Sequence, residues 1–325
     1  MDYRLFGNTG LRVSELFLGA MTFGEEAGGV AFDTAREIVD AYAEAGGNVI
    51  DTANIYLGGH SEEYVGRLLE GRRDRFVLAT KYTLSRDRSD PNAAGNHRKN
   101  LVASLEDSLR RLRTDYVDVY WAHIWDPFTP IEETMRALDD VVRAGKVLYV
   151  GFSDAPAWLV ARANTLAEWR GWTPFAGIQV PYSLIRRDAE RELIPMAEAL
   201  GLSVAAWAPL AAGILSGKYR TPGAKGRHDA AKLPERSHTI ADAVVEVAGE
   251  LGVSPAQVAL AWIRARSERV FPLVGASGAA QIKDSLASLD LVLPDEASAR
   301  LEAVTGFEVG FPRDFMAEHK THGAL

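Results

Sequence analysis

The chain has 325 residues, of which 47% are hydrophobic, and a formal net charge of −8. This length allows two domains or one α/β barrel. The lack of a basic excess argues against nucleic acid or an anionic membrane as a partner. With no cysteine the chain has no disulfide or thiolate chemistry, which suits a reducing cytoplasm. An apolar signal core at the N-terminus and an uncharged run of membrane-spanning length are both missing, so we expect a cytoplasmic protein.

Short apolar runs alternate with longer amphipathic stretches along the whole chain. The runs are rich in Val, Ile and Leu and mostly lack polar alternation, which is typical of strands buried on both faces. The eight runs are residues 16–20, 48–53, 76–81, 116–123, 147–153, 177–181, 203–209 and 270–276.

Between these runs, apolar residues recur at helical spacing. Thr129-Pro130 and Ser254-Pro255 each offer a capping hydroxyl followed by a first-turn proline, so they predict helix starts. The predicted helices are residues 33–45, 100–112, 131–143, 155–167, 189–200, 239–251 and 254–265.

Eight strand–helix units predict a single (β/α)8 TIM barrel domain over residues 1–325. A doubly wound sheet is the alternative, but the chain has no GxGxxG motif. Residues 3–13 contain two short runs around Gly7-Asn8-Thr9-Gly10, which predict a hairpin that plugs the N-terminal mouth of the barrel. Residues 213–236 form a long polar stretch, and a loop of that length usually has a function.

Four chemically suggestive side chains follow successive predicted strands. Asp51 follows residues 48–50 within the second run, Tyr56 comes just after that run, Lys81 ends the third and His123 ends the fourth. Catalytic residues of a (β/α)8 barrel come from the C-terminal ends of its strands. Each residue alone has an ordinary structural explanation, such as a cap, a solvated strand end or core packing. Together at matched strand ends they indicate a site.

The charges of these four residues suggest proton transfer to a carbonyl oxygen. A free phenol has a pKa of about 10, and a neighbouring ammonium favours its ionised form and lowers that pKa. Asp51 would keep Lys81 protonated and in position, while His123 would donate a hydrogen bond to the carbonyl oxygen. The four residues would then donate a proton to the carbonyl oxygen while a hydride is transferred to the carbonyl carbon.

Four segments of the chain resemble the aldo-keto reductase family, and the resemblance extends over nearly the whole length. They are residues 51–63 (DTANIYLGGHSEE), 109–123 (LRRLRTDYVDVYWAH), 145–153 (GKVLYVGFS) and 207–219 (WAPLAAGILSGKY). The resemblance implies Tyr56 as general acid, Asp51 and Lys81 as the pair that tunes it, and His123 as the residue that orients the substrate. It also implies a nicotinamide cofactor, with NADP(H) favoured and NAD(H) as the alternative.

The resemblance also implies positions for the cofactor. Ser153 and Gln179 match residues that hold the nicotinamide carboxamide, and Trp207 matches an aromatic residue that stacks on the ring. Asp154 stands where the family often has asparagine, and a carboxylate accepts hydrogen bonds but cannot donate them. Met21 and Ala208 are further cofactor candidates. The candidates at the pyrophosphate are Leu210, Gly213, Leu215, Gly217 and Lys218, and those at the adenosine phosphate are Gly275, Ser277 and Gln281.

The adenosine segment departs most from the family. Relatives that favour NADPH often carry Arg or Lys there, because a 2′-phosphate forms charge-assisted hydrogen bonds with them. Lys283, or Lys225 and Arg227 of the long stretch, are the substitutes that this chain offers.

Aromatic and apolar side chains are the candidates for the substrate pocket. They are Phe23, Tyr82, Trp125 and Phe128, with Met21 beside them. They suit hydrophobic or aromatic carbonyl compounds, and keto groups on sugars are a further option. The partner is therefore a small carbonyl compound, and the oligomeric state stays open.

Other signals are weaker. The segment Gly213 to Tyr219 is one residue short of a phosphate loop and lacks its Ser or Thr. His319 and His322 lie in a polar tail, so we expect no metal site. Glu62-Glu63 and Glu132-Glu133 sit near helix starts, where acids interact favourably with the helix dipole, so we interpret them as helix caps and not as the carboxylate pair of a glycosidase.

Two alternative functions remain open at this point. One is a regulatory module that binds the cofactor as a sensor with little turnover. The other is an isomerase or aldolase that uses Lys81 as a Schiff-base amine.

Overall fold

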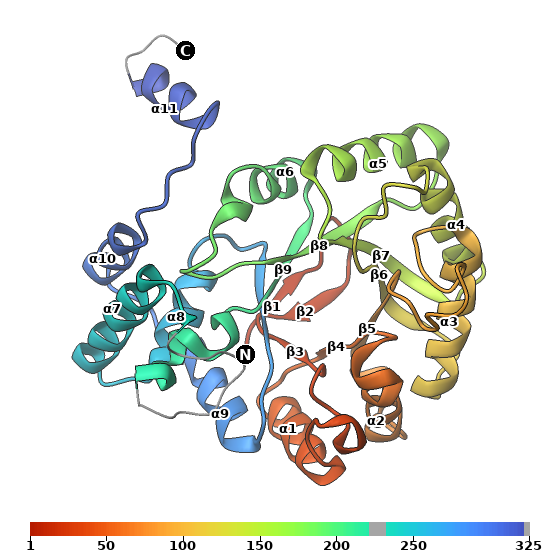
Figure 1. Ribbon diagram of the computed structural model, residues 1–325, viewed down its shortest axis with the longest axis horizontal. Coiled ribbons are helices and arrows are strands. Elements are labelled where there is room, and N and C mark those ends of the chain that lie inside the picture. The colour runs from red at the N-terminus through yellow and green to blue at the C-terminus, as the bar shows by residue number, and fades with distance from the viewer. Residues whose placement is uncertain (221–231, 322–325) are drawn as a thin grey trace.

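Within the described residues, 1–220 and 232–321, eight parallel strands close into a barrel in the computed structural model (Figure 1). They pair in chain order, and β10 closes the barrel by pairing with both β9 and β3. The barrel strands are β3 (Phe17–Gly19), β4 (Val49–Asp51), β5 (Val77–Tyr82), β6 (Val117–Ala122), β7 (Val147–Ser153), β8 (Phe175–Pro181), β9 (Ser203–Trp207) and β10 (Val270–Val274). Each corresponds to one predicted run, so the (β/α)8 barrel is confirmed.

The central strands are buried on both faces, as their sequences predict. All six residues of β5 and all six of β6 are buried. One hydrophobic cluster fills the space between barrel and helices, and a smaller one, which includes Trp121, Phe17 and Phe271, fills the barrel interior. This is the arrangement expected where helices cover a parallel sheet.

Helices form the outer layer of the barrel (Figure 1). The α-helices are α1 (Phe32–Glu44), α2 (His60–Leu68), α3 (Arg98–Leu112), α4 (Ile131–Arg143), α5 (Ala157–Arg170), α6 (Leu193–Leu200), α7 (Glu235–Leu251), α8 (Pro255–Arg264), α9 (Ala279–Ala287), α10 (Asp295–Thr305) and α11 (Arg313–Thr321). The 3-10 helices are η1 (Glu25–Ala27), η2 (Tyr56–Gly59), η3 (Arg73–Arg75), η4 (Asp188–Glu190), η5 (Ala211–Ser216), η6 (Lys218–Arg220) and η8 (Ser288–Asp290).

The predicted caps have different outcomes. Ser254 caps α8 as expected, because its hydroxyl accepts a hydrogen bond from the N–H of Gln257 at 3.2 Å. The Thr129 cap is wrong, since Pro130 is the N-cap of α4 and the Thr129 hydroxyl instead donates to Asp126 at 2.6 Å. A side chain turned back toward Asp126 cannot also reach the first turn of α4.

Two other predicted boundaries are corrected. The helix expected at residues 189–200 is divided into η4 and α6, and the helix expected from residue 239 already begins at Glu235. The predicted loop 213–236 is therefore shorter than expected, since η5 and η6 fold at its start. Residues 221–231, with Lys225 and Arg227, lie outside the described residues.

The N-terminal hairpin is confirmed. β1 (Tyr3–Leu5) pairs antiparallel with β2 (Arg12–Ser14). Phe6 follows β1 and packs edge-on against Trp121 in the barrel interior, with 6.1 Å between ring centroids. The N–H of Gly7 donates to the hydroxyl of Ser203, the first residue of β9, at 2.7 Å. The hairpin therefore covers the end of the barrel where the strands begin.

The C-terminal segment leaves the barrel after α10, and α11 lies apart from the rest of the fold (Figure 1). His319 lies on α11 with its ring 4.0 Å from that of Phe315, while His322 lies outside the described residues. Among the described residues no single helix is long and apolar enough to cross a membrane; α7 and α8 pass that test only as a pair bent by 99°.

Candidate active site

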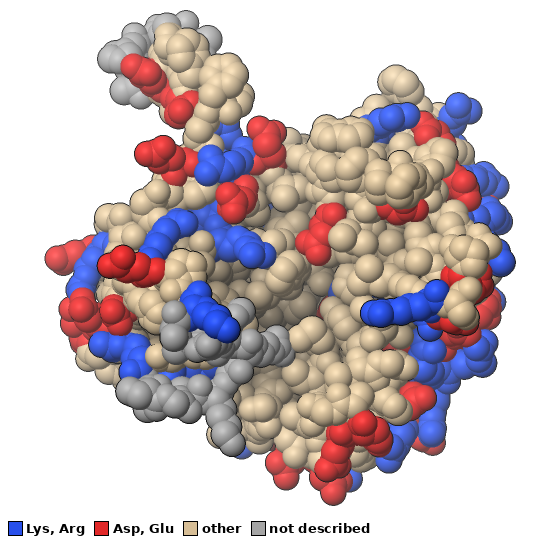
Figure 2. Space-filling view, viewed as in Figure 1, with Lys and Arg blue, Asp and Glu red and all other residues tan. Residues whose placement is uncertain are grey.

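The structure brings the four predicted catalytic residues together above the barrel. Asp51 is the last residue of β4, Tyr56 begins η2, Lys81 lies near the end of β5, and His123 directly follows β6. These three strands are neighbours in the sheet, so their C-terminal ends meet at one edge. Figure 2, in the same view as Figure 1, shows a hollow at the centre of the molecule over the barrel.

Lys81 is the centre of this set. Its side chain is fully buried, forms an ion pair with Asp51, and donates to the carbonyl of Thr52 at 2.8 Å and to the hydroxyl of Tyr56 at 3.1 Å. An ammonium has three hydrogens, and all three have an acceptor here. Lys81 is therefore held in one position, with its charge shared between a carboxylate and a phenol.

The surroundings of Lys81 keep it charged. Burial lowers its pKa, but the Asp51 carboxylate and the Tyr56 hydroxyl outweigh burial, so the pKa of Lys81 is raised. A Schiff-base lysine needs a neutral amine, which this pair opposes. The isomerase or aldolase alternative therefore loses its chemical basis.

Tyr56 remains a protonated phenol. Burial raises the pKa of Tyr56, and the opposing effect of Lys81 does not overcome it. The predicted direction of the Lys81 effect is thus correct, but the net pKa is raised and not lowered as the sequence suggested. A protonated phenol is the state that a proton donor requires.

His123 lies against Tyr56, with ring centroids 5.7 Å apart and planes at 80°. Its backbone N–H donates to the carbonyl of Tyr82 at 3.1 Å and to the hydroxyl of Thr83 at 3.2 Å. Burial, with a smaller effect of Lys81, lowers the pKa of His123 to about 3. The imidazole is therefore neutral at physiological pH and offers one N–H donor.

One ring nitrogen of His123 has no partner among the described residues. Its Nδ1 is buried and makes no hydrogen bond there. Nε2 is then the nitrogen left to meet a substrate oxygen. The pairing of a neutral imidazole with a protonated phenol supplies two donors for one carbonyl oxygen.

Three of the predicted nicotinamide residues lie at or near the ends of neighbouring strands. Ser153 ends β7, Gln179 lies in β8 and Trp207 ends β9; Ser153 and Gln179 are buried. The amide of Gln179 donates to Asp51 at 3.0 Å, which leaves its oxygen as an acceptor. A hydroxyl donor, an amide acceptor and a flat indole suit a carboxamide on an aromatic ring, so these residues fit the nicotinamide group.

The segment predicted to contact the pyrophosphate folds into the 3-10 helices η5 and η6. Ala212 and Gly213 have left-handed backbone angles there, with φ of 55° and 89°. The left-handed φ of Gly213 favours glycine at this position, because residues with a Cβ rarely adopt it. Leu210 and Ala208 are partly buried, Leu215 is fully buried in the core, Gly217 ends η5 and Lys218 is exposed.

The predicted adenosine residues lie after β10 and at the start of α9. The N–H and the hydroxyl of Ser277 both donate to the amide oxygen of Gln281, at 2.8 and 2.9 Å. Gly275, Ser277, Gln281 and Lys283 are all exposed. Met21, after β3, is 40% exposed.

The predicted substrate residues separate into two groups. Phe128 is 92% exposed on the loop after β6, and Trp125 on the same loop packs edge-on against Trp158 of α5, with centroids 5.8 Å apart. Phe23 and Tyr82 have no exposed surface and belong to the hydrophobic core. The structure therefore argues against Phe23 and Tyr82 as pocket walls, because their rings already fill core volume.

Sequence reasoning missed several supporting residues. Thr52 accepts from Lys81 through its carbonyl, Thr83 contacts the backbone of His123, and Trp158 pairs with Trp125. A backbone carbonyl leaves no residue-type signal, and Trp158 lies on a different strand–helix unit from Trp125. No sequence pattern pointed to these three contacts.

Glu62 also has a structural role beyond its position in the first turn of α2. Its carboxylate is fully buried, accepts from the hydroxyl of Thr80 at 2.5 Å, and pairs with Arg111 at 2.6 Å. The prediction that Glu62 caps α2 is wrong, since the helix has no side-chain cap. The ion pair instead joins two of the segments that carry the family resemblance.

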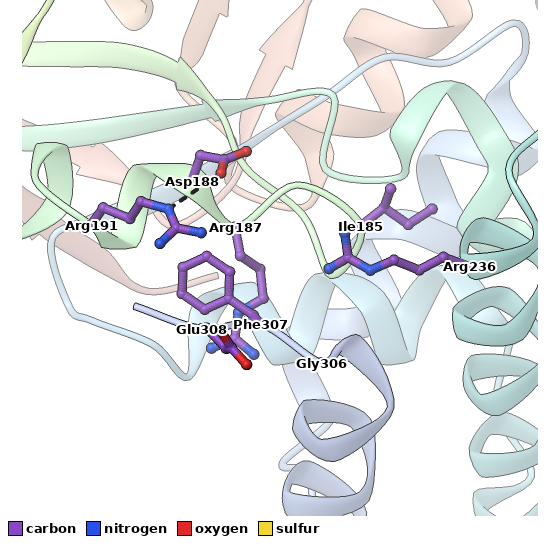
Figure 3. A pocket seen from close by; sticks show the side chains of 8 residues that line it. All are labelled: Ile185, Arg187, Asp188, Arg191, Arg236, Gly306, Phe307 and Glu308. Atoms are coloured by element: carbon purple, nitrogen blue, oxygen red, sulfur yellow. Dashed lines mark ion pairs between the residues drawn. The ribbon is translucent and has the colours of Figure 1, made fainter. Parts of the chain in front are cut away.

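A separate cavity of about 220 Å³ lies beside the C-terminal segment (Figure 3). Arg187, Arg191 and Arg236 line it, and the guanidinium groups of Arg187 and Arg191 each lie 4.8 Å from the centroid of Phe307. Arg187 pairs with Glu190, Arg191 donates to the carbonyl of Val309 and Arg236 to that of Thr305. The tetrad of Asp51, Tyr56, Lys81 and His123 does not line this cavity. The arginines of the cavity hold the C-terminal segment in place.

Comparison with known proteins shows the family to which the chain belongs. The model of the Aldo/keto reductase family matches residues 15–305. The chain is 40% identical to a norsolorinic acid reductase of Emericella nidulans, over 95% of this chain and 82% of that protein. It is 37% identical to an aryl-alcohol dehydrogenase of Pestalotiopsis microspora, over 94% and 82%. It is also 36% identical to an aldo-keto reductase of Emericella nidulans, over 96% and 83%. The chain is an NAD(P)H-dependent oxidoreductase and belongs to the aldo/keto reductase family.

Proposed function

We propose that this carbonyl reductase converts aromatic aldehydes and ketones to alcohols, with Tyr56 as its proton donor. The observation that carries the proposal is the contact of 3.1 Å between the ammonium of Lys81 and the hydroxyl of Tyr56. A protonated phenol beside a fixed positive charge can lose its proton in the transition state and keep the resulting negative charge stabilised.

Each of the four residues has a separate role in the reaction. Tyr56 donates the proton to the carbonyl oxygen, and Lys81 stabilises the phenolate that remains. Asp51 keeps Lys81 charged and in place, and Gln179 in turn holds Asp51. Neutral His123 donates a second hydrogen bond that orients the carbonyl group. The reduced nicotinamide, when bound, supplies the hydride to the carbonyl carbon.

The nicotinamide would be held by Ser153 and Gln179, with Trp207 against its ring. The backbone of η5 with Lys218 would contact the pyrophosphate, and Ser277, Gln281 and Lys283 the adenosine end. We propose a preference for NADPH, supported by the exposed cations Lys218 and Lys283 on this side of the site. Dissociation constants for NADPH and NADH test it, and clearly tighter NADH would contradict it.

The aromatic substrate class is supported by the residues beside the site. Trp125 and Trp158 form a T-shaped pair, and Trp125 is linked to the site because its backbone N–H donates to the carbonyl of Asp154 at 3.4 Å. Aromatic rings favour edge-to-face or offset contacts with other rings. The name of the Pestalotiopsis relative, an aryl-alcohol dehydrogenase, is consistent with this class.

The substrate class is tested by Trp125→Ala. We expect kcat/KM for an aromatic aldehyde to fall about tenfold relative to an aliphatic aldehyde, which corresponds to about 1.4 kcal/mol of lost ring contact. Trp169→Ala is the matched control, because Trp169 is 80% exposed and lies near the end of α5. Equal losses for both aldehydes in Trp125→Ala would contradict the aromatic class.

The sensor alternative has no support in the site. All four tetrad residues are present, Lys81 contacts Asp51 and Tyr56, and the rings of Tyr56 and His123 meet edge to face. A cofactor-binding module without turnover would not need this arrangement.

A further inference from the structure

Asp154 occupies an unusual position directly after Ser153 at the end of β7. Its φ is 46°, in the left-handed region that Asp and Asn tolerate better than most residues. Its N–H donates to the carbonyl of Gln179 at 3.1 Å, and one carboxylate oxygen accepts from the indole N–H of Trp207 at 3.2 Å. Asp154 thus touches two of the three residues that we assign to the nicotinamide.

A continuous series of contacts joins this carboxylate to the proton donor. Trp207 donates to Asp154, Asp154 donates through its backbone to Gln179, and Gln179 donates to Asp51. Asp51 pairs with Lys81, which donates to Tyr56. Trp207 and the tetrad are therefore parts of one connected site, and Asp154 lies between them.

The carboxylate of Asp154 interacts with two cations, Lys81 and Arg186, without forming an ion pair with either. Among the described residues no cation lies within ion-pair distance of it, and the nearby Lys81 is already paired with Asp51. Arg186 is exposed, with its guanidinium 6.0 Å from the centroid of the Trp207 ring. Burial raises the pKa of Asp154, while the Trp207 N–H, Lys81 and Arg186 oppose that rise. A partly buried carboxylate bonded to a neutral indole keeps an electrostatic effect on whatever lies against that indole.

We propose that Asp154 is a positioning residue of the nicotinamide subsite whose carboxylate favours the oxidised cofactor over the reduced one. The nicotinamide ring is a cation when oxidised and neutral when reduced, so a nearby negative charge stabilises only the oxidised form. In the balanced reaction, carbonyl, reduced cofactor and a proton give alcohol and oxidised cofactor. Asp154 would shift the bound equilibrium toward alcohol and oxidised cofactor. This inference rests on the proposed function, because it places the nicotinamide against Trp207.

The test is a comparison of binding constants, which needs no turnover. Dissociation constants of NADP⁺ and NADPH are measured by calorimetry at pH 8 for the unmodified protein and for Asp154→Asn. Asparagine keeps the shape, tolerates the left-handed backbone and can still accept from Trp207. We expect NADP⁺ binding to weaken about tenfold relative to NADPH. Asp115→Asn, which removes an exposed carboxylate just before β6 at the opposite end of the barrel, is the matched control and should leave the ratio unchanged.

Two further variants separate charge from hydrogen bonding. Trp207→Phe keeps the carboxylate and removes the indole donor, so both affinities should fall while their ratio stays close to that of the unmodified protein. If Asp154→Asn does not fold by circular dichroism, Asp154→Gly replaces it, because glycine also accepts the left-handed angle.

If the ratio of the NADP⁺ and NADPH dissociation constants were unchanged in Asp154→Asn, or in Asp154→Gly where that variant replaces it, the proposed role of Asp154 would be wrong. The proposed function would then remain intact. If the unmodified protein bound none of NADP⁺, NADPH, NAD⁺ and NADH, the proposed function would fail, and the inference about Asp154 with it. If it bound only NAD⁺ and NADH, the same ratio would be measured with that pair.

Discussion

The ammonium of Lys81 lies 3.1 Å from the hydroxyl oxygen of Tyr56 and donates a hydrogen bond to it. Because both groups are largely removed from water, this contact influences the protonation of each, together with burial and with Asp51. Burial raises the pKa of Tyr56, and the contact with Lys81 partly offsets that rise. The phenol therefore stays protonated in the resting site, while the charge that would stabilise its conjugate base is already in place.

Replacing Lys81 by methionine should damage both catalysis and stability. The phenolate would lose its counter-charge, so we expect kcat to fall at least about 100-fold. Asp51, which is only 2% exposed, would be left as an unpaired buried carboxylate, at a cost of about 3–5 kcal/mol. Urea unfolding and steady-state kinetics measure the two effects.

The double variant Lys81→Met, Asp51→Asn separates the effect on catalysis from the effect on stability. It should regain most of the stability, because no unpaired charge remains, and it should stay inactive. Recovery of activity in this double variant would show that the Lys81 charge is not required.

Arg111→Met should destabilise the fold without removing a catalytic group. Glu62 is fully buried and pairs with Arg111 at 2.6 Å, so the variant leaves a buried carboxylate with only Thr80 as a partner. We expect a loss of about 3–5 kcal/mol in the free energy of unfolding. Arg110→Met is the control: its side chain is 70% exposed and pairs with Asp107, so the loss should stay below about 1 kcal/mol. Equal losses in the two variants would contradict a structural role for the buried pair.

Because the fold keeps His123 neutral, we expect the free energy of unfolding to fall in mild acid. The pKa of His123 is about 3 in the fold, against about 6.5 in an unfolded chain, and burial is the main cause. Between these values the unfolded chain binds a proton that the fold does not, so stability is lost as the pH falls below 6.5. The loss has a slope of at most about 1.4 kcal/mol per pH unit.

The comparison with His123→Gln isolates this contribution. Between pH 7 and pH 5, the unmodified protein should lose about 2 kcal/mol more than the variant. His60→Gln, on the exposed start of α2, serves as the control and should follow the unmodified protein. If His123→Gln and the unmodified protein lost stability in parallel, the imidazole would not be held neutral by the fold.

The sequence predicted the barrel well because its strands are buried on both faces. That burial demands continuous apolar runs, and β5 and β6 lie within one or two residues of their predicted limits. The tetrad could be predicted for the same reason, since the C-terminal ends of neighbouring strands meet. The helices α9, α10 and α11 are not among the predicted helices. α11 has no buried residue among its described side chains, but α9 buries three, so weak contact with the core explains only part of what was missed.

The direction in which a side chain points could not be predicted. Phe23 and Phe128 look alike in sequence, yet one is fully buried and the other is 92% exposed. The net pKa of Tyr56 was also out of reach, because it depends on how deeply the ring is buried as well as on the nearby Lys81. These properties arise from packing between strand–helix units that are distant in the chain.

The most direct test is the oxidation of NADPH and NADH with a reactive aromatic aldehyde, for the unmodified protein and for Tyr56→Phe. The variant lacks only the hydroxyl that carries the proton, so we expect turnover to fall about 10²- to 10⁴-fold while cofactor affinity is retained. Tyr64→Phe removes a hydroxyl that instead donates to Glu26 at 3.0 Å, and should keep full activity. Normal turnover in Tyr56→Phe would contradict the assignment of Tyr56 as the proton donor.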